Sequence, residues 1–193
     1  MRIINTRFIK SASKRAEFID DELPQIAIVG RSNVGKSSLI NLLTNNKKLA
    51  KTSSTPGRTR LVNYFNVNDR FYLVDLPGYG FAKASKNISN NWDSVINDYF
   101  TDNEKLRLVF VLLDCRLAPS ELDMMMFDYL ASHELPAVVI LTKIDKISRS
   151  QLNLSIDKIA KTIRFNKNMI IPTSANKKIG VEKIESILDE YIK

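Results

Sequence analysis

Short apolar runs along the chain alternate with longer segments in which apolar residues recur at every third or fourth position. Runs rich in β-branched and aromatic residues predict strands, whereas the wider spacing predicts amphipathic helices. The predicted strands cover residues 25–29, 61–67, 70–75, 108–113, 137–141 and 169–171. One predicted helix begins at residue 35, and the others cover 85–100, 122–130, 156–163 and 181–192. No internal repeat interrupts this alternation.

The alternation predicts an α/β fold. Strands that are apolar on both faces belong in a mainly parallel sheet that helices cover on both sides. Asn68-Asp69 separates two of the strand runs, which predicts a hairpin and one antiparallel edge strand. We therefore expect a mostly parallel six-stranded sheet in a single domain over residues 23–193. Residues 1–22 are expected to form a basic N-terminal extension that packs on this domain.

Composition excludes several classes of protein. The chain has 193 residues, of which 44% are hydrophobic and 26% charged, so it can bury a core and is not disordered. No apolar run approaches the roughly 18 residues of a membrane span, and residues 1–10 lack the apolar core of a secretory signal. A single cysteine, Cys115, excludes an internal disulfide. We therefore expect a cytoplasmic protein.

The positive charge is concentrated in the first third of the sequence. The net charge is +8; residues 1–68 hold 12 Lys/Arg and 4 Asp/Glu, whereas residues 69–193 hold 17 of each. Residues 31–68 carry seven basic residues and no acidic one. Such a face attracts polyanions, most simply a nucleic-acid backbone. A solvated surface rich in lysine is the alternative. The basic residues without another predicted role are Arg2, Arg7, Lys10, Lys14, Arg15, Lys47, Lys48, Lys51, Arg58 and Arg60.

A glycine-rich segment after the first predicted strand matches the pattern G-x-x-x-x-G-K-[ST] and precedes a predicted helix. Its backbone N–H groups and the helix N-terminus would surround phosphate oxygens. Lys36 would reach the β- and γ-phosphates and Ser37 would bind Mg²⁺; a simple glycine turn is the alternative. This P-loop and the residue after it comprise Gly30, Arg31, Ser32, Asn33, Val34, Gly35, Lys36, Ser37 and Ser38.

A second segment ends a strand in a carboxylate. Asp75 would hold Mg²⁺, and the N–H of Gly78 would approach the γ-phosphate. The loop before the predicted hairpin contains Thr59, which looks like the switch threonine that completes the Mg²⁺ shell when a γ-phosphate is present. The nucleotide-binding residues predicted in these two segments are Gly57, Arg58, Thr59, Asp75, Leu76, Pro77 and Gly78.

Two further loops predict the choice of base. The carboxylate of Asp145 can accept hydrogen bonds from the N1–H and amino group of guanine, whereas adenine presents a lone pair there. Thr142 stands where similar motifs have asparagine, so we expect modest affinity; a helix-capping aspartate is the alternative. The loop after the last strand resembles one whose backbone N–H faces guanine O6. The residues concerned are Thr142, Lys143, Ile144 and Asp145, then Thr173, Ser174, Ala175 and Asn176.

Together, 30–38, 52–59, 75–83 and 142–145 closely resemble the EngB/YihA/YsxC family of bacterial ribosome-assembly GTPases, within the TrmE-Era-EngA-EngB-Septin-like superfamily. The run Asp75-Leu-Pro-Gly-Tyr-Gly-Phe-Ala-Lys83 is the most family-specific part. The resemblance implies a P-loop NTPase fold of the Ras-like type, with GTP or GDP and Mg²⁺ as cofactors. It also implies a cytoplasmic monomer that binds the large ribosomal subunit and its rRNA, not DNA or a membrane.

The sequence offers no obvious general base. Tyr79 follows Gly78, where many GTPases place a water-orienting glutamine, and the only histidine, His133, is far from the motifs. Slow hydrolysis would depend on positioning and charge neutralisation by Lys36, Thr59 and Gly78. The resemblance suggests that Asn33 holds a K⁺ ion that stimulates hydrolysis; the alternative is that it only stabilises the loop.

Other functions stay open on the sequence alone. A P-loop ATPase is one, although Asp145 disfavours adenine. A nucleotide-regulated RNA-binding protein outside ribosome assembly is another, and a membrane GTPase would need spanning helices. Because the acid-free stretch 31–68 contains Thr59, nucleotide state could control RNA affinity. Tyr79 and Phe81 either dock on a partner or pack internally.

Overall fold

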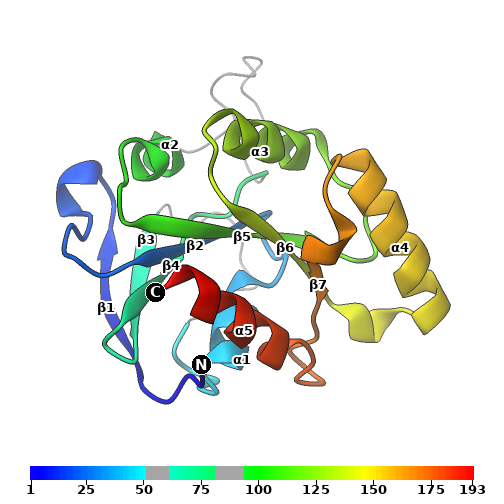
Figure 1. Cartoon of the computed structure of the whole chain (residues 1–193), viewed down its shortest axis with the longest axis horizontal. Coiled ribbons are helices and arrows are strands. Elements are labelled where there is room, and N and C mark those ends of the chain that lie inside the picture. Colours follow the sequence, from blue (N-terminus) through cyan, green and yellow to red (C-terminus); the bar gives the residue numbers. More distant parts are fainter. Residues whose placement is uncertain (51–60, 81–93) are drawn as a thin grey trace.

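A computed structural model describes residues 1–50, 61–80 and 94–193 of the chain. Its centre is one seven-stranded sheet with the order β1-β3-β4-β2-β5-β6-β7 (Figure 1). The strands are β1 (Thr6–Ala12), β2 (Gln25–Gly30), β3 (Val62–Val67), β4 (Phe71–Asp75), β5 (Leu106–Asp114), β6 (Ala137–Thr142) and β7 (Ile170–Pro172). The expected α/β fold with a mostly parallel sheet is confirmed.

The parallel strands are buried on both faces. All six residues of β2 and eight of the nine in β5 are buried. The pairs β2–β4, β2–β5, β5–β6 and β6–β7 are all parallel. Continuous apolar runs of this kind are stable only when helices cover both sides of the sheet.

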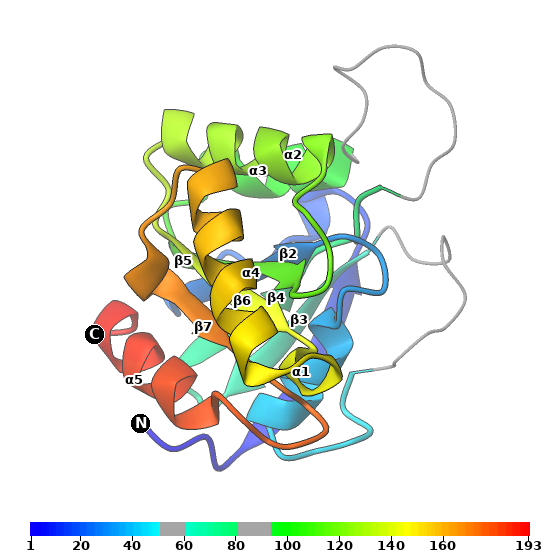
Figure 2. The ribbon, with the colours of Figure 1, turned by 90° about the vertical axis from the view of Figure 1, so that its right-hand side faces the viewer.

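Helices lie on both faces as predicted (Figures 1 and 2). Apolar residues of α2, α3 and α4 pack in one core, and those of α1 and α5 in the other. The helices are α1 (Lys36–Leu43), α2 (Ser94–Phe100), α3 (Glu121–Ser132), α4 (Arg149–Thr162) and α5 (Val181–Tyr191), with 3₁₀ turns at Arg15–Glu17, Ile144–Lys146 and Lys167–Met169. The first part of the helix predicted over 85–100 lies outside the described residues. No helix in the described ranges is long and apolar enough to cross a membrane.

The predicted hairpin is confirmed. Asn68 and Asp69 both have φ of 54°, and the N–H of Arg70 donates to the Val67 carbonyl at 3.0 Å. Positive φ at both central residues is the requirement of a type I′ turn, whose twist matches that of the flanking strands. Asparagine and aspartate tolerate this backbone better than most residues.

The prediction of six strands, with the antiparallel strand at the edge, was wrong. β1 pairs antiparallel with β3 from Thr6↔Val67 to Ala12↔Val62, so β3 is an interior strand and β1 forms the edge. Only Ala12 of β1 is buried. The strand therefore lacks an apolar pattern and is held mainly by backbone hydrogen bonds, which the side-chain sequence does not encode. Part of the expected extension is thus a strand of the sheet itself.

The first residues of the chain also contact the C-terminal helix α5. The N–H of Ile3 donates to Glu185 Oε1 at 3.0 Å, and the terminal amino group pairs with Asp189. Both carboxylates belong to α5, and the N-terminus lies beside that helix (Figure 2). Residues before β1 therefore connect the edge of the sheet to its C-terminal helix.

Candidate functional site

The segments with predicted chemistry leave the sheet at one edge. The P-loop (residues 30–37) follows β2, Asp75 ends β4, Thr142 ends β6, and residues 173–176 follow β7. Because these strands are parallel, their carboxyl ends meet at the same edge, where ligands of open α/β sheets bind. The fold therefore brings together every described segment that the sequence predicted to bind nucleotide.

The P-loop is built tightly against β5 and opens into α1. A Cβ at Gly30 would lie 2.8 Å from Val34 Cγ1 and 2.9 Å from the carbonyl oxygen of Leu112, so only glycine fits there. Gly35 has φ of 119°, and α1 begins at the next residue, Lys36. The first turn of a helix leaves N–H groups without helical partners and carries a partial positive charge. This geometry fits the phosphate site that the sequence predicted.

Base-side residues bind the outward-facing carbonyls of the P-loop. Lys143 Nζ donates to the carbonyl oxygen of Asn33 at 2.9 Å, and the Thr142 hydroxyl donates to that of Val34 at 2.8 Å. Thr142 is buried. The Thr142 hydroxyl thus joins β6 to the P-loop, although threonine lacks the amide of the usual asparagine. The modest nucleotide affinity expected from this replacement stays a prediction.

The switch segment (residues 75–79) is hydrogen-bonded to the other end of the P-loop. The N–H of Tyr79 donates to the Gly30 carbonyl at 3.3 Å, and the N–H of Ser32 donates to the Tyr79 carbonyl at 3.0 Å. A Cβ at Gly78 would lie 3.1 Å from Lys36 Nζ. Gly78 therefore places its backbone against the lysine that should neutralise the γ-phosphate.

Asp75 has the properties of a cation ligand. Its side chain is buried, and Oδ1 has no hydrogen-bond partner within the part of the chain that the structure describes. Burial raises the pKa of this carboxyl, and the charge of Lys36 opposes the rise. A buried carboxylate without a partner is costly, and a bound cation would remove that cost.

These residues fit Mg²⁺. The described ranges contain no cluster of three or more His, Cys, Asp and Glu able to hold a metal. Asp75 would therefore share the ion with the hydroxyl of Ser37, at the start of α1, and with phosphate oxygens. Gly57, Arg58 and Thr59, the last predicted as a third metal ligand, lie outside the described residues.

A cavity of about 250 Å³ lies between α1 and the two base loops. Its lining comprises Val34, Gly35, Ser38, Leu39, Leu42, Thr142, Lys143, Asp145, Lys146, Thr173, Ala175 and Asn176. The Ser174 hydroxyl donates to Asp145 Oδ1 at 2.7 Å and the Asn176 amide donates to Oδ2 at 3.2 Å. The hydrogen bond from Ser174 is the main reason that the pKa of Asp145 lies below its usual value. The carboxylate therefore stays ionised and ready to accept hydrogen bonds from guanine.

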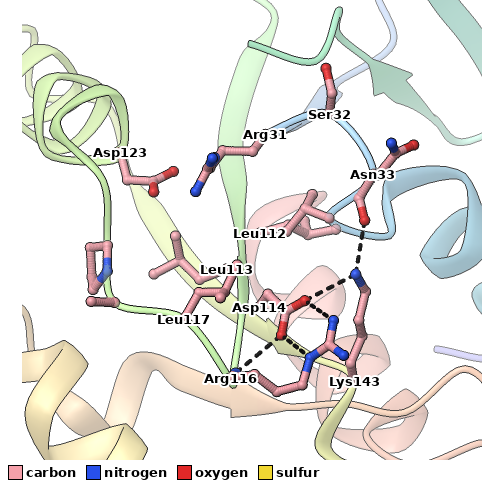
Figure 3. A pocket seen from close by; sticks show the side chains of 13 residues that line it. Arg31, Ser32, Asn33, Leu112, Leu113, Asp114, Arg116, Leu117, Asp123 and Lys143 are labelled. Carbon is pink, nitrogen blue, oxygen red and sulfur yellow. Dashed lines mark hydrogen bonds and ion pairs between the residues drawn. The ribbon is translucent and has the colours of Figure 1, made fainter. Parts of the chain in front are cut away.

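Sequence reasoning missed an ion-pair network behind Lys143 (Figure 3). Asp114 Oδ2 lies 3.0 Å from Lys143 Nζ and 2.7 Å from the Arg116 guanidinium, which donates a second bond to Oδ1 at 2.9 Å. Burial acts to raise the pKa of Asp114, but hydrogen bonds from Arg116 and Lys143 lower it to about 2. The sequence did carry a signal for this network. Asp114 ends a buried strand, and Arg116 follows it by two residues.

Packing decides the alternative that the sequence left open for Tyr79. Its side chain is buried, so it packs internally. His133 stacks on Tyr129 with ring centroids 4.1 Å apart, at the end of α3. It is exposed and takes no part in the site, as expected. Phe81 lies outside the described residues.

Comparison with known proteins gives consistent relatives. A family model described as a 50S ribosome-binding GTPase matches residues 25–143. The probable GTP-binding protein EngB of Thermoanaerobacter pseudethanolicus is 44% identical over 191 residues, covering 99% of this chain and 100% of that protein. The protein of the same name from Clostridium perfringens is 45% identical over 194 residues, covering 100% and 98%.

Solved structures agree on the fold. A crystal structure of a probable GTP-binding protein EngB superposes with a TM-score of 0.72 at 24% identity, covering 87% of this chain and 98% of that one. A structure of Era in complex with MgGDPNP and nucleotides 1506–1542 of 16S ribosomal RNA gives a TM-score of 0.67 at 25% identity, covering 89% and 57%.

The first prediction concerns the buried carboxylate. Without nucleotide and Mg²⁺, Asp75→Asn should raise stability by about 1 kcal/mol, or roughly 2–4 °C in Tm, because a buried charge without a partner is removed. The raised folded-state pKa of Asp75 means that wild-type stability falls as pH rises through that pKa, and the variant should lose this dependence. Thermal unfolding at several pH values measures both effects.

Addition of Mg²⁺ and GDP supplies the control. The wild-type protein should gain more stability from Mg²⁺ than the variant does, since the variant lacks the carboxylate that would bind the ion. An Asp75→Asn protein that keeps the full Mg²⁺-dependent rise in Tm would contradict the assignment of this residue as a metal ligand.

The second prediction concerns the choice of base. Asp145→Asn should weaken guanine nucleotide binding by at least about 3 kcal/mol, roughly 100-fold, because two hydrogen bonds to a charged acceptor are lost. Xanthine, with a carbonyl in place of the amino group, should now be tolerated. Displacement of labelled GDP by GTP, ATP and XTP measures this preference.

An exposed aspartate on α4 provides the matched substitution. Asp157 pairs only loosely with Lys167, at 3.7 Å, and is remote from the base cavity. Asp157→Asn should keep the wild-type order of affinities. If Asp145→Asn also kept it, the carboxylate would not be what selects guanine.

Proposed function

Because the chain belongs to the EngB family of GTP-binding proteins, a family of GTPases, we propose that it is a switch in assembly of the large ribosomal subunit. The observation that carries this proposal is one P-loop bonded on one side to a guanine-selecting loop and on the other to the switch segment. A family description that names 50S ribosome binding supports the choice of partner. The same proposal makes the protein a cytoplasmic monomer that contacts rRNA, not DNA or a membrane.

Hydrolysis is expected to be slow because the sequence offers no obvious general base. Catalysis then depends on positioning of the phosphates and neutralisation of their charge. The amides at the start of α1 and the Lys36 ammonium stabilise charge on the phosphates. Ser37 and Asp75 would hold Mg²⁺, which would supply further neutralisation of phosphate charge. Gly78 offers its N–H to the γ-phosphate. The Tyr79 side chain is buried away from the phosphates, so it does not orient the attacking water.

A K⁺ ion at Asn33 belongs to the same proposal. The Asn33 backbone has φ of 63°, and its carbonyl is held by Lys143. Figure 3 shows its side chain pointing away from that lysine, and the residue is exposed. An amide oxygen beside the phosphate site can therefore hold a cation where a positive charge would stabilise the developing charge of the reaction.

The RNA-binding face is proposed at the end of α1. Lys47 and Lys48 are exposed and enter no ion pair with the described residues. By contrast, Arg7 and Arg15 of the N-terminal segment are paired with Asp69 and Asp102. These lysines directly precede residues 51–60, which contain Thr59, the predicted switch threonine. Nucleotide state and RNA affinity can therefore be linked there. An RNA partner outside ribosome assembly is the alternative.

The chain has a second basic region in its C-terminal part. Residues 143–183 hold ten Lys/Arg and three Asp/Glu, an excess that the neutral total over 69–193 conceals. Several of these lysines, including Lys158 and Lys161, are exposed on α4. This region provides a matched surface against which the proposed face can be tested.

The third prediction tests the RNA face. Lys47→Glu/Lys48→Glu should weaken co-sedimentation with large-subunit particles and lower the salt slope by about 2, because roughly two phosphate contacts are lost. Binding should depend on whether GTP, GDP or no nucleotide is present, whereas GDP affinity of the variant stays unchanged.

Lys158→Glu/Lys161→Glu introduces the same charge change on α4 and should affect binding less. An equal loss in both double variants would mean that overall charge, rather than this face, carries binding. Binding that is insensitive to salt would contradict an RNA partner altogether.

The fourth prediction tests the cation. Turnover of GTP in KCl should exceed turnover in NaCl of equal ionic strength by on the order of tenfold, because a K⁺ ion at Asn33 would stabilise the developing charge of the reaction. Asn33→Ala should remove this difference while GDP still binds. Equal turnover of the wild-type protein in both salts would show that Asn33 only stabilises the loop.

A further inference from the structure

A buried hydrogen bond joins the switch segment to α3. The hydroxyl of Tyr79 donates to Asp123 Oδ1 at 2.9 Å, and both side chains are almost fully buried. Asp123 lies in the first turn of α3, where its Oδ2 accepts the N–H and the hydroxyl of Ser120 at 2.8 and 2.7 Å. One carboxylate therefore caps the helix and binds the residue that directly follows Gly78.

The backbone of Tyr79 is fixed at the same time. Its N–H and carbonyl bond to Gly30 and Ser32 of the P-loop, at 3.3 and 3.0 Å. The side-chain bond to Asp123 supplies a third attachment in another direction. Three attachments on one residue restrict the position of its neighbour, Gly78, which lies against Lys36.

Packing alone does not define this position. Asp123 borders a cavity of about 230 Å³ that Arg31 faces from the P-loop side (Figure 3). Leu113 and Leu117 form part of its apolar wall. The phenol packs in the core, but this side of the carboxylate is not closely packed, so its hydrogen bonds to Tyr79 and Ser120 help to hold it in place.

The ionisation states suit a permanent donor and acceptor. Burial and the neighbouring carboxylate of Asp123 raise the pKa of Tyr79 well above its usual value, so the phenol keeps its proton. A buried carboxylate whose phenol donor was removed would lose one of its three hydrogen bonds. The pair is therefore expected to stay bonded whenever the switch segment lies against the P-loop.

We propose that Tyr79 is a positioning residue for GTP hydrolysis, whose hydrogen bond to Asp123 holds the Gly78 N–H where the γ-phosphate will lie. The hydroxyl is bonded to a buried carboxylate and acts only by fixing the backbone beside it. Preorganised donors accelerate a reaction because no binding energy is used to order them. The inference rests on the GTPase activity and is independent of the ribosomal role.

The test is Tyr79→Phe, which removes one oxygen atom and keeps the ring. Single-turnover GTP hydrolysis should fall by about tenfold while the Kd for GDP changes less than twofold, because GDP has no γ-phosphate to meet Gly78. Asp123→Ala, which removes the acceptor, should slow hydrolysis as well. The double variant should be no slower than the slower single variant, since both remove the same bond.

Two control variants separate positioning from general stability. Tyr72→Phe removes a similar bond, from the Tyr72 hydroxyl to Asp21 at 2.6 Å, near the start of β4 and far from the phosphates. Ser120→Ala weakens the cap of α3 but leaves the Tyr79 hydroxyl on Asp123. Tyr72→Phe should retain the wild-type hydrolysis rate even where Tm falls, and Ser120→Ala should lose less of the rate than Tyr79→Phe.

Three outcomes would overturn the proposal. The first is a wild-type rate in Tyr79→Phe, and the second is a loss of GDP affinity equal to the loss of rate. The third is a rate as low in Ser120→Ala as in Tyr79→Phe. Should Tyr79→Phe not fold, as judged by Tm with GDP, Asp123→Ala decides by the same comparison. The wild-type protein is assayed in parallel. If it does not hydrolyse GTP, the GTPase activity is contradicted rather than the role of Tyr79.

Discussion

The structure depends on how the P-loop divides its backbone groups between protein and ligand. Its carbonyl oxygens point outward and are bound by neighbours: one by the N–H of Tyr79, one by the ammonium of Lys143 and one by the hydroxyl of Thr142. The N–H groups at the start of α1 are thereby left facing the phosphate site. Anion binding follows because donors gather on one side and acceptors are satisfied on the other.

This arrangement physically connects the two ends of the nucleotide. The residues that bind the outward carbonyls belong to the base loop on one side and to the switch segment on the other. A change in either segment must therefore shift the loop that holds the phosphates. Asp114 reinforces the base side by holding Lys143, and Asp123 reinforces the switch side by holding Tyr79.

The two functional carboxylates are tuned in opposite directions by their surroundings. Asp145 receives hydrogen bonds from Ser174 and Asn176, which lower its pKa and keep it ionised, so that it can accept hydrogen bonds from the base. Asp75 has a buried oxygen without a hydrogen-bond partner among the described residues, and burial raises its pKa. The predicted base-selecting and metal-binding sites thus use one residue type in two environments.

The sequence by itself determined the strands with apolar runs, the Asn68-Asp69 turn and the motifs at strand ends, because each is local and depends on residue type. Only the tertiary structure decided that residues 6–12 complete the sheet, since that strand is paired through its backbone and has almost no apolar pattern. It also decided the partners of Asp114 and Asp123. Such contacts join residues distant in sequence, and their geometry exists only after the sheet has brought the loops to one edge.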